Sequence, residues 1–224
     1  SYILLEHLKI LGRSLLLASL YELNFHYTGG YDPEFDSLTR SYVNDCEIDF
    51  VRSFMWETTG AILDVGAYVG KMFYGLQPHF PNWEYVAVDP WEMFPTPLYE
   101  WWKPTSLEDD TSSPMNHSKY FATNCPYAKY HIECYENIIF PKDSFDIIIM
   151  SQCSKNINLY DHYVKAINEV KTDGIIIGRN FGTASESKGG GRSTYEQVTD
   201  IVTNLIEPEN FEIEPQYKNM FAIW

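Results

Sequence analysis

Short apolar runs alternate with amphipathic segments along residues 60–224. Mainly apolar runs lie at 61–65, 85–88, 145–150 and 175–177, and a shorter alternating run lies at 129–133. Runs without polar alternation are typical of strands buried on both faces of a parallel sheet. Helical spacing of apolar residues predicts helices over 71–80 and 160–171, and a third from a capping box at 193–196 to just before Pro208. Two last strands, 211–213 and 220–224, with a short connection predict an antiparallel hairpin.

This order of elements predicts a doubly wound α/β fold. We expect a seven-stranded, mostly parallel sheet with helices on both faces and a C-terminal antiparallel hairpin. We expect a single domain over 1–224, in which the α/β core covers 60–224 and an insertion covers 92–127. The insertion has several prolines and little periodicity. A segment of that length inside a compact domain is usually functional, so we expect it to lie ordered over the carboxyl edge of the sheet.

Residues 1–59 predict an N-terminal helical cap. Leu4, Leu8, Leu11 and Leu15 form an apolar stripe on a helix over 1–22, and a less regular helix is predicted over 35–57. The stripe suits packing against the core, a homodimer partner or a neighbouring domain. The alternative is a lid over a bound ligand.

One strand–turn–helix–strand unit carries the strongest functional signal. The first strand contains Asp64, Gly66 and Gly70 bracket the turn, and the next strand closes at Asp89. The unit has the usual βαβ size of about 30 residues. Glycines let the backbone approach a ligand at a helix N-terminus, and an acid at the tip of the second strand can accept hydrogen bonds from a ribose. The pattern predicts a cofactor that contains a nucleoside.

The net charge and the cysteine content limit the kinds of molecule that we expect the chain to bind. The chain has 16 Lys and Arg against 31 Asp and Glu, a net charge of −15, which disfavours nucleic acid and anionic membranes. Its apolar runs are too short to span a bilayer, and no signal-peptide pattern is present. The four cysteines form no C-x-x-C pair and no histidine lies at zinc spacing. We therefore expect a reduced, cytoplasmic protein without a metal site.

The segments ILDVGAYVG (62–70), AVDPW (87–91) and FPKDSFDIIIMSQC (140–153) occur in order along the predicted core. In these segments, and in the helices, strands and hairpin around them, residues 60–224 resemble the Rossmann-like core of class I S-adenosylmethionine-dependent methyltransferases. The resemblance implies S-adenosylmethionine as the cofactor and methyl transfer to an acceptor as the reaction.

The resemblance also implies roles for individual residues. Asp64 would lie near the methionine amino group of the cofactor, and Asp89 would hold the ribose hydroxyls. Tyr68 stands where the family has a third glycine, so its ring would either touch the cofactor or pack in the loop. Trp91 would stack on the adenine or pack under the insertion. The full set of predicted cofactor-binding residues is Asp64, Gly66, Ala67, Tyr68, Gly70, Asp89, Trp91, Cys134, Tyr135, Ser151 and Gln152.

The predicted reaction is O-methylation of a small-molecule or glycan acceptor. The abundance of Trp and Tyr and the net acidity favour a sugar hydroxyl. A hydroxyl nucleophile needs a general base, and His162 and His117 are the candidates, although either could be structural. Ser151-Gln152-Cys153 follows the fourth strand, where metal-dependent relatives place an Asp, so a catalytic metal is not expected.

Two other functions stay open. An NAD-dependent oxidoreductase would carry G-x-G-x-x-G, whereas this chain has glycines only at Gly66 and Gly70 of the turn. The other alternative is a non-catalytic Rossmann-like binding module. Tyr68 and Cys134 favour it, because both depart from the family pattern.

Overall fold

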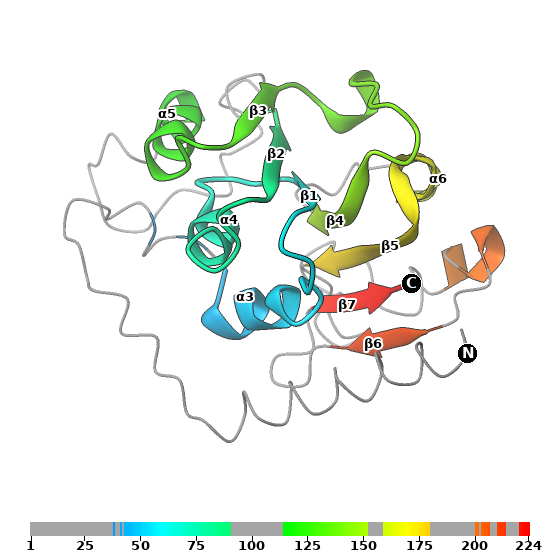
Figure 1. Cartoon of the computed structure of the whole chain (residues 1–224). Helices are drawn as coiled ribbons and strands as arrows, with labels where there is room; N and C mark the ends of the chain where they lie inside the picture. Colours follow the sequence, from blue (N-terminus) through cyan, green and yellow to red (C-terminus); the bar gives the residue numbers. More distant parts are fainter. Residues whose placement is uncertain are drawn as a thin grey trace, which may run out of the picture.

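Seven strands form one sheet in the order β3-β2-β1-β4-β5-β7-β6 (Figure 1). The parallel strands are β1 (Ala61–Val65), β2 (Glu84–Asp89), β3 (Lys129–Ile132), β4 (Phe145–Ser151) and β5 (Val170–Arg179). β7 (Met220–Ile223) pairs antiparallel with β5, and β6 (Phe211–Ile213) pairs antiparallel with β7. The predicted doubly wound sheet with a terminal hairpin is therefore confirmed.

The computed structural model describes residues 38, 41, 43–90, 114–151, 159–179, 200–201, 203–206, 210–213 and 220–224. The predicted helix over 1–22, Trp91 and Gln152 lie outside these residues. None of the described helices is long and apolar enough to cross a membrane.

Helices cover both faces of the sheet (Figure 1). On one face, α3 (Asp45–Arg52), α4 (Lys71–Leu76) and α5 (Pro114–Asn124) pack on alternate strand residues that include Ile62, Ile149 and Ile177. On the other, α6 (Leu159–Glu169) and residues Ile201 and Leu205 pack on the intervening positions. Because successive strand residues point to opposite faces, burial on both sides explains why these strands are mainly apolar and do not alternate with polar residues.

Three predicted helices end earlier than expected. The helix predicted over 35–57 is α3, which begins at a capping box formed by Asn44 and Glu47. The helix predicted over 71–80 ends at Leu76, because Pro78 has no N–H to donate to the preceding turn. The helix predicted over 160–171 ends at Glu169, and β5 begins directly at Val170 with a register shift opposite Phe145 and Ile147.

The predicted insertion contains a helix that the periodicity missed. α5 occupies Pro114–Asn124 and begins with a proline, which has a fixed φ suited to the first helical position. Phe121 on this helix is fully buried and contacts Phe73 of α4 edge to face, at 6.3 Å between ring centroids. α5 is thus part of the core, although the sequence around it has weak helical periodicity.

Candidate functional site

The β1–α4 turn lies at the carboxyl edge of the sheet, where open α/β sheets bind ligands. Three of its residues have left-handed backbones: Gly66 (φ 85°), Tyr68 (φ 51°) and Gly70 (φ 81°). The left-handed region costs a non-glycine residue roughly 1–2 kcal/mol. Tyr68 therefore keeps the backbone shape that a glycine would favour at this position, although it adds a side chain to the turn.

Asp89, at the tip of β2, holds that turn in place. Its Oδ2 accepts a hydrogen bond from the Tyr68 N–H at 2.9 Å, and the Gly66 N–H donates to the Val88 carbonyl oxygen at 2.7 Å. A carboxylate has further lone pairs for other donors. The arrangement brings the two predicted cofactor elements, the turn and the acid, into direct contact.

Asp64 is a buried acid at the end of β1. It is only 4% exposed, and among the described residues its Oδ1 has no hydrogen-bond partner. Burial raises the pKa of Asp64 to about 7, with the Arg179 guanidinium lowering it and Asp89 raising it further. An unpaired oxygen on a buried acid is costly, so a ligand that brings a cation or an N–H donor fits this position.

Arg179 and Ser151 share a sheet face with Asp64. Asp64 is in register with Ile149, and Ser151 with Arg179, and residues of this alternation face α3 and α4. The Arg179 Nε donates to Glu47 Oε1 of α3 at 3.3 Å, and both residues are buried. The prediction from sequence included Ser151 but missed Arg179 and Glu47.

Two signals could have found the missed pair. Arg179 directly follows three isoleucines and a glycine, so a charged residue ends the buried half of β5. Glu47 is the third residue of its helix, the position from which a glutamate completes a capping box. Neither signal predicts that Arg179 and Glu47 contact each other.

Cys134 and Tyr135 follow β3 at the same edge. Asp89 is among the acids that raise the pKa of the Cys134 thiol, after burial, Glu136 and Glu133, so this cysteine stays a protonated thiol near the tip of β2. The Tyr135 side chain is buried and its hydroxyl donates to Glu169 Oε2 at 2.6 Å. Tyr135 therefore leaves its backbone, and not its ring, for contact with a ligand.

His162 lies in the first half of α6. Its Nε2 is 3.1 Å from Glu136 Oε2, its ring contacts that of Tyr135, and it is 7% exposed. The general-base role of His162 stays a prediction. His117 is a residue of α5, but its side chain lies outside the described part of the structure. Among the described residues, no group of three His, Cys, Asp or Glu side chains could hold a metal ion.

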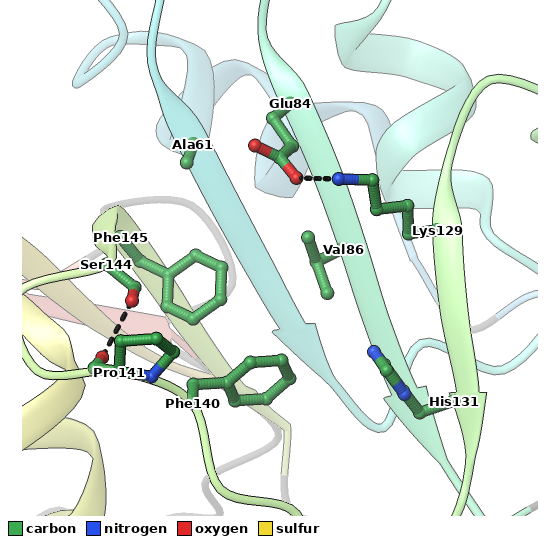
Figure 2. A pocket seen from close by; sticks show the side chains of 9 residues that line it. All are labelled: Ala61, Glu84, Val86, Lys129, His131, Phe140, Pro141, Ser144 and Phe145. Atoms are coloured by element: carbon green, nitrogen blue, oxygen red, sulfur yellow. Dashed lines mark hydrogen bonds and ion pairs between the residues drawn. The ribbon is translucent and has the colours of Figure 1, made fainter.

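A pocket of about 310 Å³ lies at the opposite edge of the sheet (Figure 2). It is formed at the amino ends of β1 to β4, because only the short η5 (Tyr135–Asn137) and extended residues connect β3 to β4. Its lining residues are Ala61, Glu84, Val86, Lys129, His131, Phe140, Pro141, Ser144 and Phe145. Since Asp64 and Asp89 lie at the carboxyl ends of β1 and β2, this pocket is separate from the predicted cofactor site.

No protein-family model and no curated protein sequence matches this chain. Solved structures do match its fold. A candidate O-methyltransferase from Nostoc punctiforme matches with a TM-score of 0.55 and 10% identity, over 79% of this chain and 55% of its own length. A TehB-like SAM-dependent methyltransferase from Corynebacterium glutamicum matches with a TM-score of 0.53 and 12% identity, over 85% of this chain and 91% of its own.

A third match is geranyl diphosphate C-methyltransferase from Streptomyces coelicolor, whose structure contains S-adenosyl-L-homocysteine. Its TM-score is 0.54 at 7% identity, over 80% of this chain and 74% of its own. At such identities the similarity establishes the fold alone. The chain therefore has the class I methyltransferase fold, which the sequence motifs predicted.

Proposed function

We propose that this chain binds S-adenosylmethionine at the carboxyl edge of β1, β2 and β4 and transfers its methyl group to a small-molecule acceptor. The observation that supports this most directly is Asp64, a buried acid beside a left-handed turn that Asp89 holds; one of its oxygens has no partner in the part of the chain that the structure describes. When bound, the cofactor supplies an electrophilic methyl group on a sulfonium. The protein then has to bind, orient and exclude water.

The residues present fit this cofactor. Asp64 offers an oxygen to the methionine ammonium, and Asp89 offers its carboxylate to the ribose hydroxyls. The backbone of Gly66, Ala67, Tyr68 and Gly70 lies beside the nucleoside, with Cys134, the Tyr135 backbone and Trp91 proposed for the adenine. Ser151 is the last residue of β4 and Gln152 is next in the sequence; we propose that the acceptor meets the methyl group there.

Calorimetric titration tests the proposal. We expect S-adenosylmethionine and S-adenosylhomocysteine to bind and NAD not to bind. A preference for NAD would instead indicate an oxidoreductase, and a folded protein that binds none of the three would indicate a non-catalytic module.

Asp89→Ala should weaken the binding of S-adenosylhomocysteine by at least about tenfold, the scale of a hydrogen bond to a charged group. Glu84→Ala is the matched control, because Glu84 is the acid at the other end of the same strand and pairs with Lys129. We expect the Glu84→Ala variant to bind S-adenosylhomocysteine as tightly as the unmodified protein does. An unchanged affinity in Asp89→Ala would mean that the ribose is not held there.

For the acceptor we propose a sugar hydroxyl, with His162 or His117 as the base. The support is the aromatic and acidic composition; the matched Streptomyces enzyme is a C-methyltransferase, so the fold leaves the acceptor atom open. Incubation with labelled S-adenosylmethionine and a panel of sugars tests this. If His162 is the base, His162→Asn should lower kcat and leave the affinity for S-adenosylhomocysteine unchanged.

A further inference from the structure

We propose that Arg179 binds the carboxylate of the methionyl part of the cofactor, and that Glu47 holds the guanidinium in the orientation this requires. The inference rests on the proposed function and assigns one more residue to the same site. It makes the end of β5 part of that site.

Arg179 has hydrogen-bonding capacity that the fold does not use. The residue is 6% exposed; its Nε donates to Glu47 Oε1, but among the described residues its Nη2 has no partner. A guanidinium carries its charge at any ordinary pH and presents its donors as a planar fork. Buried donors without an acceptor are costly, and a carboxylate is the acceptor that matches the fork best.

Glu47 does not reach the other side of the fork: it accepts from the Arg179 Nε, whereas the Arg179 Nη2 has no hydrogen-bond partner among the described residues. Its Oε2 accepts the Asn44 N–H at 2.7 Å in the capping box of α3, and its Oε1 accepts the Arg179 Nε. Both bonds hold Glu47 fixed, because the residue is fully buried. A purely structural role, in which the pair attaches α3 to β5, accounts for Nε but not for the unpaired Nη2.

The position of Asp64 indicates which anion Arg179 binds. Asp64 and Arg179 lie on the same sheet face and at the same edge, separated by β4 and offset by two residues along the strands, which places their backbones about 12 Å apart. Within the described ranges of the chain, each has one buried polar atom without a hydrogen-bond partner. When Asp64 is ionised, its charge is opposite to that of Arg179. An α-amino acid carries an ammonium and a carboxylate on one carbon, so it complements both residues at once.

The test compares two ligands that differ in one group. S-adenosylhomocysteine carries the carboxylate, and S-adenosyl-3-thiopropylamine lacks only that group. We expect the unmodified protein to bind S-adenosylhomocysteine at least about tenfold more tightly, as a charge-assisted pair predicts. Arg179→Gln should reduce this preference to near unity, whereas Arg52→Gln, at a partly buried arginine of α3 that pairs with Asp49, should leave it intact.

Two results would overturn the inference while the proposed function stands: equal binding of both ligands by the unmodified protein, or an unchanged preference in Arg179→Gln. The first of these needs no variant, so the test holds even if Arg179→Gln fails to fold. If the unmodified protein binds neither ligand, the proposed function fails together with the inference.

Discussion

Tyr135 and Tyr163 pack on the same face of the sheet, and both are almost fully buried. The Tyr135 hydroxyl donates to Glu169, whereas the Tyr163 hydroxyl has no hydrogen-bond partner among the described residues. Burial raises the pKa of both phenols. Two chemically identical groups therefore differ in what they contribute to stability, because only one of them recovers the hydrogen bonds it loses on leaving water.

Replacing each tyrosine by phenylalanine separates the two cases. Tyr163→Phe removes an unpaired buried hydroxyl and should raise the free energy of unfolding by about 1 kcal/mol, whereas Tyr135→Phe should lower it by about 1–2 kcal/mol. Urea denaturation followed by circular dichroism measures both. A loss of stability in Tyr163→Phe would show that its hydroxyl has a partner in the native protein.

At the scale of elements, α5 supports the turn that forms the candidate site. The Asn124 Nδ2 donates to the Val69 carbonyl oxygen at 2.8 Å, and the Cys125 thiol lies 3.3 Å from the Gly70 carbonyl oxygen. Gly70 itself has a φ of 81°, and a Cβ there would lie 2.6 Å from Cys125 Sγ. The segment between β2 and β3 thus fixes the start of α4 from outside.

Gly70→Ala should therefore destabilise the fold by about 2 kcal/mol or more, from left-handed strain and overpacking together. Thermal and urea unfolding measure the loss. In a double-mutant cycle, Cys125→Ala should recover the part due to contact with the sulfur. If the cycle shows no coupling, the thiol does not limit the space at Gly70.

At the scale of the whole molecule, Asp64 links stability to pH. Its native pKa is about 7 against an ordinary 3.8. Between these two pKa values the native state holds a proton on Asp64 that the unfolded state has lost. The contribution of the protonated Asp64 to the free energy of unfolding is therefore fully present below about pH 4 and is lost as the pH rises through 7. The many other acids also titrate at low pH, so the effect has to be isolated by substitution.

Asp64→Asn provides that isolation, because the amide stays neutral. The stability of the unmodified protein relative to this variant should fall as the pH rises from 5 to 8. Saturation with S-adenosylhomocysteine should weaken this trend, since its ammonium favours the ionised carboxylate. Denaturant unfolding at several pH values measures the difference, and a constant difference would mean that Asp64 is not buried as a neutral acid.

The sequence was sufficient to predict where the strands lie along the chain, the doubly wound class of the sheet and the terminal hairpin. A strand buried on both faces must be mainly apolar, and this requirement is visible in a local run such as 145–150, in which Asp146 is the one charged residue and is half-buried. The acids at the strand ends, Asp64 and Asp89, were predictable for a related reason: a charged residue that closes an apolar run needs a partner.

Only the tertiary structure decided which distant residues meet. α5 is held by burial of Phe121 and not by strong periodicity, so packing, which local sequence does not encode, determines it. Likewise Arg179, Glu47 and Asp64 come from three separate segments and converge through sheet order and register. A residue's chemistry can be read along the chain, but its partners depend on the strands that the fold places beside it.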